Sequence, residues 1–208
     1  MLVLQVCRAF SSPMSPMQLG ALRPLGAACT SEGIRRDTGV VSWLHWPNLV
    51  TIDGRVVAST STSIRPMKQK TRVVFNLSVN CYAETAESFP KGLRAASILD
   101  VLGVEIERDL LRDKVLHALD WYCAELERGM HRKLLDRMRP TIAWMGNQVR
   151  VRTATGGTLT GLAKGLDDQG RLLLQSLDVN RRVRALPAEE VELVQQVTND
   201  RAPWRTLL

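Results

Sequence analysis

The chain has 208 residues, of which 45% are hydrophobic and 24% charged, so it can bury a core of ordinary size and form one domain with a small appendage. Its apolar runs are interrupted by Arg, Pro or Gly before they reach the roughly 18 residues of a membrane span. The net charge of +7 would attract nucleic acid or an acidic protein, but only 5% of the residues are aromatic. We therefore expect no membrane contact, no specific nucleic-acid binding and a solvated basic face.

The four cysteines and three histidines are too widely spaced for a zinc site or a disulfide framework. We interpret the cysteines as small buried hydrophobic residues in a reducing compartment, and we expect a cytoplasmic protein. The first 31 residues contain arginine but no acid, which also suits a mitochondrial or plastid targeting segment. Residues 1–10, however, have the pattern of a buried strand, and both interpretations stay open.

The first elements predict a sheet with a packed helix. After a strand over 2–8, Pro24 can open a helix that Gly39 closes. Two further prolines, Pro13 and Pro16, join Pro24 in arguing against one long helix in this region.

A hairpin is predicted next. Strands are expected over 40–46 and 49–52, and the sequence Asp53-Gly54 then predicts a type I′ turn, whose two central residues have positive φ. The return strand is expected over 56–63. A further strand over 72–80 would pair beside it in an antiparallel sheet.

Helical periodicity dominates the middle of the chain. From Glu105 to Arg128, acids come early, an arginine comes late and apolar residues recur on one stripe. A second, shorter helix is expected to end at Arg139, because Pro140 removes the next amide donor. The predicted stripe consists of Ile106, Leu110, Val115, Leu119, Tyr122 and Leu126.

Beyond this point the pattern changes to short strands separated by turns. Strands over 149–152, 159–166, 171–175 and 181–185 predict a small closed barrel. We therefore divide the chain into an α+β domain over 1–143, a barrel over 144–197 and a tail over 198–208.

Several motifs, in this order, resemble the biotin protein ligases. The segment 35–59, "RRDTGVVSWLHWPNLVTIDGRVVAS", is similar to the family's "tGv...lKWPNDvlvdgrKvaG". "LQVCRAF" resembles its core strand, "VVFNLSVN" stands where the family has "VGIGLNVN", and "AASI" stands where it has "ATSL". The segment 146–176 resembles the family's SH3-like C-terminal barrel.

This resemblance implies an α+β fold with a mixed or antiparallel sheet of the class II synthetase-like ligase core, followed by an SH3-like barrel. The implied reaction is ATP-dependent formation of biotinyl-AMP and transfer of biotin to a lysine of a carrier protein. ATP, magnesium and biotin are the implied ligands, and a biotin carboxyl carrier domain is the implied partner. Lipoate or another acyl group in place of biotin stays open.

Several charged positions of the family motifs hold uncharged or weakly basic residues in this chain. The lysine of "KWPND" is His45, the acid associated with magnesium is Leu49, and the lysine of "KvaG" is Val56. Val74 replaces a family glycine and should occupy ligand space. The family's arginine-rich biotin loop, "GRGRxxR", would precede the first strand and is not found in the 208 residues.

The candidate substrate-binding residues are therefore mostly uncharged, and we name no catalytic residue or protein metal ligand. His45 would be either a pH-dependent cation or a cap on the sheet edge. Trp46 would be a pocket wall or a core residue, and Asn48 would offer an amide to a base or phosphate. The set is His45, Trp46, Asn48, Asn80 and Ser97.

Two function hypotheses follow. The chain is a biotin protein ligase, or it is a ligase-like pseudoenzyme that keeps the scaffold and acts as a binding or regulatory protein. Loss of charge-stabilising groups, each worth on the order of 3 kcal/mol in the barrier, favours the second. Unpaired sheet edges also predict a homodimer.

Overall fold

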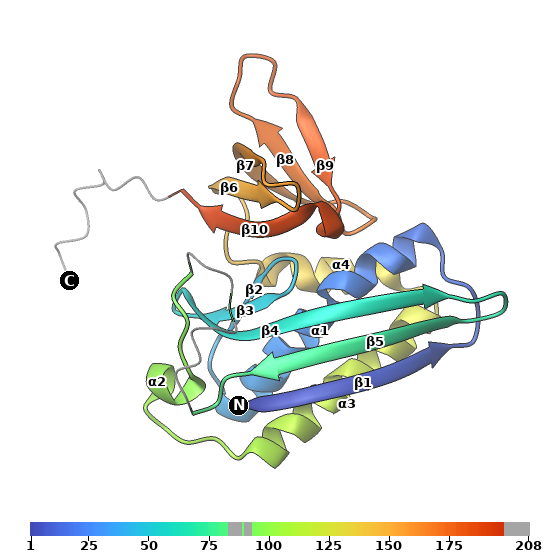
Figure 1. Ribbon diagram of the computed structural model, residues 1–208, viewed down its shortest axis with the longest axis vertical. Coiled ribbons are helices and arrows are strands. Elements are labelled where there is room, and N and C mark those ends of the chain that lie inside the picture. The colour runs from blue at the N-terminus through green and yellow to red at the C-terminus, as the bar shows by residue number, and fades with distance from the viewer. Residues whose placement is uncertain (83–88, 90–92, 198–208) are drawn as a thin grey trace.

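The computed structural model describes residues 1–82, 89 and 93–197, which form two antiparallel sheets and four α-helices (Figure 1). The strands of the first sheet lie in the order β1-β5-β4-β3-β2, in agreement with the predicted α+β class. Their bounds are β1 Leu2–Phe10, β2 Trp43–His45, β3 Leu49–Ile52, β4 Arg55–Pro66 and β5 Thr71–Val79.

Helices cover one face of this sheet and leave the other face open (Figure 1). Strand β5 shows the division, because Val73, Phe75 and Leu77 are buried while Asn76 and Ser78, which alternate with them, are partly exposed. The helices are α1 Pro16–Thr38, α2 Ile98–Leu102, α3 Arg108–Glu127 and α4 His131–Met138, and a 3-10 turn covers Arg139–Thr141.

Helix α1 begins earlier than the sequence predicted. Ser15 caps it by accepting a hydrogen bond from the amide of Gln18, whose side chain in turn accepts from the amide of Ser15. Pro24 lies buried inside the helix, so the expectation that prolines exclude a long helix here was wrong. Packing of α1 against both the sheet and α3 outweighs the lost amide bond. Gly39 ends the helix at φ 73°, as predicted.

The hairpin prediction is confirmed. Asp53 and Gly54 have φ values of 48° and 70°, the signs that a type I′ turn requires. Strand β4 continues to Pro66 and is longer than expected, whereas β2 is shorter and spans only three residues.

Helix α3 buries a different leucine from the one predicted. Leu110 is 45% exposed, whereas the neighbouring Leu111 is fully buried. At the first turn of a helix, periodicity alone does not separate adjacent apolar residues. Gly33 of α1 allows the two helices to approach, since a Cβ there would lie 2.4 Å from Cγ2 of Val115.

The cysteines do not all lie inside the protein. Cys29, Cys81 and Cys123 are buried free thiols, but Cys7 is exposed. Cys7 is on β1, where alternate side chains face the open side of the sheet. The interpretation of four buried cysteines was therefore wrong for Cys7.

The second sheet follows α4 and carries the strands predicted for the barrel. Its order is β10-β6-β7-β8-β9, so β9 and β10 do not pair and the predicted closure is wrong. We refer to this open second sheet as the barrel. Pro187 and a 3-10 turn at Ala188–Glu190 separate these two strands. We keep the domain boundary at 143/144 as a proposal, and the tail at 198–208 lies outside the described residues. The bounds are β6 Gln148–Thr153, β7 Thr158–Leu166, β8 Leu172–Ser176, β9 Val183–Leu186 and β10 Val191–Gln196.

The β7–β8 turn of the second sheet packs directly on α1. A Cβ added to Gly20 would lie 1.8 Å from the carbonyl oxygen of Gln169, and one added to Gly170 would lie 2.7 Å from the carbonyl oxygen of Gly20. Two backbones can meet this closely only where side chains are absent. The small residues at these positions fix how the barrel sits on the core.

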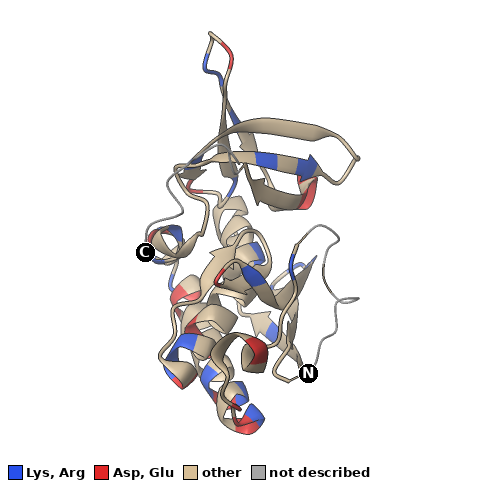
Figure 2. Cartoon of the chain, turned by 90° about the vertical axis from the view of Figure 1, so that its left-hand side faces the viewer, with Lys and Arg blue, Asp and Glu red and all other residues tan. Residues whose placement is uncertain are grey.

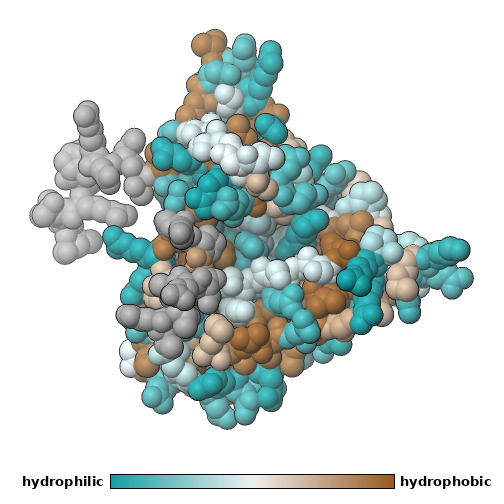
Figure 3. Space-filling view, in the orientation of Figure 1, coloured by the Kyte–Doolittle hydropathy of each residue, from teal (hydrophilic) through white to brown (hydrophobic). Residues whose placement is uncertain are grey.

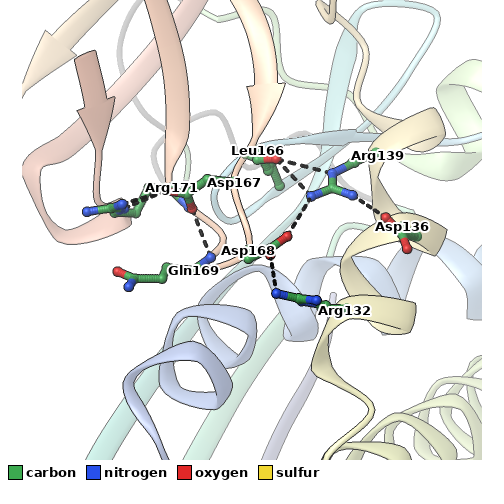
Figure 4. A network of polar contacts seen from close by, with 8 residues as sticks. All are labelled: Arg132, Asp136, Arg139, Leu166, Asp167, Asp168, Gln169 and Arg171. Atoms are coloured by element: carbon green, nitrogen blue, oxygen red, sulfur yellow. Dashed lines mark hydrogen bonds and ion pairs between the residues drawn. The ribbon is translucent and has the colours of Figure 1, made fainter. Parts of the chain in front are cut away.

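Charged groups from α4 and from the 3-10 turn after it hold the same region of the second sheet (Figure 4). The guanidinium of Arg139 donates to the carbonyl oxygen of Leu166 at 2.9 and 3.2 Å and also contacts Asp136. Arg132 pairs with Asp168 at 2.8 Å. The bonds to Leu166 and Asp168 orient the turn, because each joins the helical region to the barrel through a directed donor.

Candidate functional site

The five candidate residues lie in three different environments. His45 lines a large cleft between the two sheets, and Asn48 lines a smaller cavity on the other side of the hairpin. Trp46, Asn80 and Ser97 are buried. The structure therefore does not gather the candidates around one point.

His45 connects the first sheet to the barrel. Its Nε2 contacts the carbonyl oxygen of Val194 on β10, and its ring meets Trp144 edge-on with 6.5 Å between centroids. Since a carbonyl oxygen only accepts, Nε2 carries the hydrogen in this contact. Burial lowers the pKa of His45 from its ordinary value of 6.5, so the ring is neutral and does not replace a lysine cation. Of the two alternatives for His45, the structure favours the structural one.

The buried imidazole predicts a dependence of stability on pH. Because the folded-state pKa lies below 6.5, the unfolded chain binds the proton first, and the contribution of His45 is complete above pH 6.5 and lost as the pH falls. We expect His45→Phe to reduce the loss of stability between about pH 7 and about pH 5. Thermal melts of both proteins at the two pH values measure this. Equal pH slopes would contradict it.

Three candidates serve the fold. Trp46 is fully buried in the core, which supports the core alternative for it, and its Nε1 has no partner among the described residues. Asn80 donates through Nδ2 to the carbonyl oxygen of Ala96 at 3.3 Å. Ser97 caps α2 and exchanges hydrogen bonds with Asp100. A ligand contact by Asn80 or Ser97 remains a proposal.

Asn48 lies where the hairpin meets the barrel. Its carbonyl oxygen accepts from the amide and the hydroxyl of Thr60, at 2.8 and 3.2 Å. It lines a cavity of about 180 Å³ together with Arg23, Thr62 and Val191. This cavity is small for a nucleotide, so Asn48 fits a polar edge contact better than a base pocket.

The cleft between the sheets has a volume of about 560 Å³, within the range of small-molecule sites. Its lining includes two cations, Arg94 and Arg150, and none of its described residues is acidic. Figure 2 shows Lys and Arg segments on both the barrel and the core. The remaining lining residues are His45, Thr51, Gly54, Leu93, Ala143, Trp144, Gln195, Gln196 and Val197.

Trp144 lines the cleft and has a buried donor without a described partner. It is 1% exposed, and its indole Nε1 has no hydrogen-bond partner among the described residues. A buried donor without a partner carries a desolvation cost that a ligand or water can offset. Sequence reasoning missed Trp144, Arg94 and Arg150, because no motif marks them and only the fold brings them together.

An apolar cluster adjoins the cleft. Leu49 and Val56, which stand where the resemblance expects an acid and a lysine, pack together with Phe89 and with Leu193 of the barrel. Leu93 contacts this cluster and also lines the cleft. The two positions where the resemblance expects a charged residue therefore lie in one cluster, and apolar packing takes the place of both charges. Replacing a buried ion pair by well-packed apolar residues is often neutral or stabilising.

Magnesium does not fit the described lining. The cleft has no carboxylate, and no group of three or more His, Cys, Asp or Glu among the described residues could hold a metal ion. Oxygen ligands are what Mg²⁺ requires from a protein. We therefore assign no chemical step to a protein-bound magnesium ion.

The barrel and the whole chain resemble known proteins. Residues 145–192 match the family described as the biotin protein ligase C terminal domain. The bifunctional ligase/repressor BirA of Bacillus subtilis is 26% identical over 174 residues, which cover 81% of this chain and 51% of BirA. The chain is a biotin protein ligase-like protein. It spans about half the length of the curated relatives that it matches.

Solved structures support the ligase fold. The apo biotin protein ligase of Aquifex aeolicus matches with a TM-score of 0.71 and 17% identity, covering 94% of the ligase-like chain and 83% of that protein. The same enzyme in complex with biotin and ATP gives 0.70 and 17%, with 94% and 79% covered. A biotin protein ligase-like protein of unknown function from Silicibacter gives 0.69 and 14%, with 90% and 79% covered. These matches confirm the expected fold.

Proposed function

We propose that this ligase-like chain binds biotin and ATP in the cleft and catalyses formation of biotinyl-AMP. The observation that carries the proposal is a cleft of about 560 Å³ between core and barrel, with two arginines and no described acid, in a chain whose relatives are biotin ligases. A structure of the Aquifex aeolicus ligase contains both biotin and ATP. A cationic lining suits a triphosphate and a carboxylate.

The proposed reaction develops negative charge that residues of the cleft would have to stabilise. A carboxylate oxygen of biotin attacks the α-phosphorus of ATP, the bond to the β-phosphate oxygen breaks, and pyrophosphate leaves. Negative charge grows on the α-phosphate oxygens, where directed cations lower the barrier most. We propose that Arg94 and Arg150 act there, because Val56 supplies no charge. The Nε1 hydrogen of Trp144 would donate to the ligand.

The second half of the proposed reaction needs a protein acceptor. A lysine amine of a biotin carboxyl carrier domain attacks the biotinyl carbonyl carbon, and AMP leaves with the electron pair of the mixed anhydride. A homodimer and a cytoplasmic site of action remain proposals, the latter supported by free cysteines that suit a reducing compartment. None of the described helices is long and apolar enough to cross a membrane.

Isothermal titration tests the proposed ligand site. We expect binding of a non-hydrolysable biotinyl-adenylate mimic, weakened at least about tenfold in Arg94→Ala and in Arg150→Ala because a charge-assisted contact is lost. Lys164→Ala is the control, since Lys164 is an exposed barrel cation outside the cleft.

The outcomes separate the hypotheses. No heat from biotin or the mimic, in a sample shown to be folded by circular dichroism, would overturn the ligase proposal. Binding of the mimic without pyrophosphate release from ATP and biotin would instead support the pseudoenzyme alternative. Equal affinities of all three variants for the mimic would show that Arg94 and Arg150 do not contact it.

A further inference from the structure

Strand β4 has a free edge over its second half. It pairs with β3 only up to Ser59, while its other side pairs with β5 from Ala58 as far as Pro66. The amide of Thr60 donates to Asn48 and therefore points away from β5. Because amides alternate along a strand, the N–H and C=O groups of Thr62 and Ile64 point the same way. Among the described residues, no backbone group pairs with them.

The free edge lies in a groove between the core and the barrel. Two cavities, of about 380 and 180 Å³, follow it: Ile64 and Pro66 line the larger, and Thr60 and Thr62 line the smaller. Arg23 of α1 lines both, so the two cavities are neighbours along the strand. The hydroxyl oxygen of Thr62 is buried without a described partner. This groove therefore offers unpaired backbone and side-chain groups of the kind that a further strand would satisfy.

A cationic tip stands at the end of the groove. Arg65 and Arg72 lie directly opposite each other on β4 and β5, an arrangement that is unfavourable for like charges. Lys68 and Lys70 follow in the connecting turn, and no described acid forms an ion pair with any of the four. Figure 3 shows a hydrophilic projection at this end of the sheet and hydrophobic atoms beside the strand. An anionic partner would relieve the repulsion.

We propose that the groove and the cationic tip dock an extended, acidic strand of the protein that accepts biotin. The identity of the acceptor rests on the function proposed above. Backbone pairing along β4 would supply affinity and the cationic tip would supply charge selection. A nucleic acid would leave the strand edge unpaired, and a second copy of this chain would bring an identical cationic tip into the contact.

The experiment measures docking without catalysis. A carrier domain without biotin, whose acceptor lysine is replaced by arginine, is titrated into the chain in the absence of ATP and biotin. We expect the double variant Lys68→Glu, Lys70→Glu to bind at least about tenfold more weakly at about 50 mM salt, where screening is weak. Lys164→Glu, Arg182→Glu carries the same charge change on exposed barrel residues and should bind within about twofold of the parent.

A second variant tests the strand edge itself. Ile64→Pro removes an amide that faces the groove, a change that edge strands tolerate. We expect it to weaken carrier binding at least about tenfold while the melting temperature and circular dichroism spectrum show a folded protein.

Each remaining outcome decides against the proposal. Equal effects of the two charge-reversed double variants would assign the attraction to net charge alone. Absence of binding by the parent chain would overturn the choice of partner. Loss of a sedimenting dimer in Ile64→Pro, with carrier affinity unchanged, would assign the edge to a second copy. If the Lys68→Glu, Lys70→Glu variant lost binding to duplex DNA but kept its affinity for the carrier, the cationic tip would be assigned to nucleic acid. The docking titrations contain no ATP. Their results therefore stay valid even if the chain does not form biotinyl-AMP and the proposed function fails.

Discussion

Val56→Lys should destabilise the protein and should not create a more active ligase. The substitution introduces the lysine that the resemblance expects, but the side chain would enter an apolar cluster with no carboxylate beside it. An uncompensated buried charge typically costs about 3–5 kcal/mol. Chemical denaturation measures the loss, and the rate of pyrophosphate release measures the activity. A lysine variant as stable as the parent would show that the cluster opens to solvent.

Two further variants separate charge from size. Val56→Met adds length without charge and should cost only about 1–3 kcal/mol. The double variant Leu49→Asp, Val56→Lys should be less destabilised than the sum of the two single changes, by about 1–3 kcal/mol, because the two charges then lie together. Strict additivity would contradict the assignment of both positions to one cluster.

Gly20→Ala is expected to disturb the position of the barrel. The new Cβ would lie 1.8 Å from a backbone oxygen of the β7–β8 turn, and backbone cannot swing away as a flexible side chain can. Overpacking of this kind typically costs about 1–3 kcal/mol, despite the gain in helix propensity. Denaturant unfolding measures the cost, and faster proteolysis at the barrel would report its release from α1.

The control for this change is Gly26→Ala in the same helix. Its Cβ would meet the side-chain atom Cδ2 of Leu77 at 3.1 Å, and that atom can move. We expect a change within about 1 kcal/mol, since adjustment and helix propensity offset each other. A Gly20→Ala protein as stable as this control would show that the turn yields without cost.

Local patterns predicted much of the fold. The Asp53-Gly54 turn, the helix end at Gly39 and the strands of the second sheet were all readable, because each depends on residues close in sequence. Two errors have a common cause. The passage of α1 through Pro24 and the open side between β9 and β10 depend on packing between distant segments.

The candidate site was much harder to predict. His45 could be interpreted from sequence as a cation, and only its burial against Val194 identifies a neutral ring. Arg94 and Arg150 come from segments 56 positions apart and carry no motif, so the sequence gives no reason to place them in one cleft. Sequence did identify Leu49 and Val56 as departures, but not that they belong to one apolar cluster.

The shared apolar cluster of Leu49 and Val56 constrains how this protein can evolve. A charged pair and an apolar pair can each be stable at this place, whereas a mixed pair leaves one charge buried without a partner. Every path of single substitutions back to the charged pair therefore passes through a destabilised intermediate. Once both positions are apolar, selection for a charged site therefore favours cations elsewhere in the cleft over an acid at position 49 and a lysine at position 56.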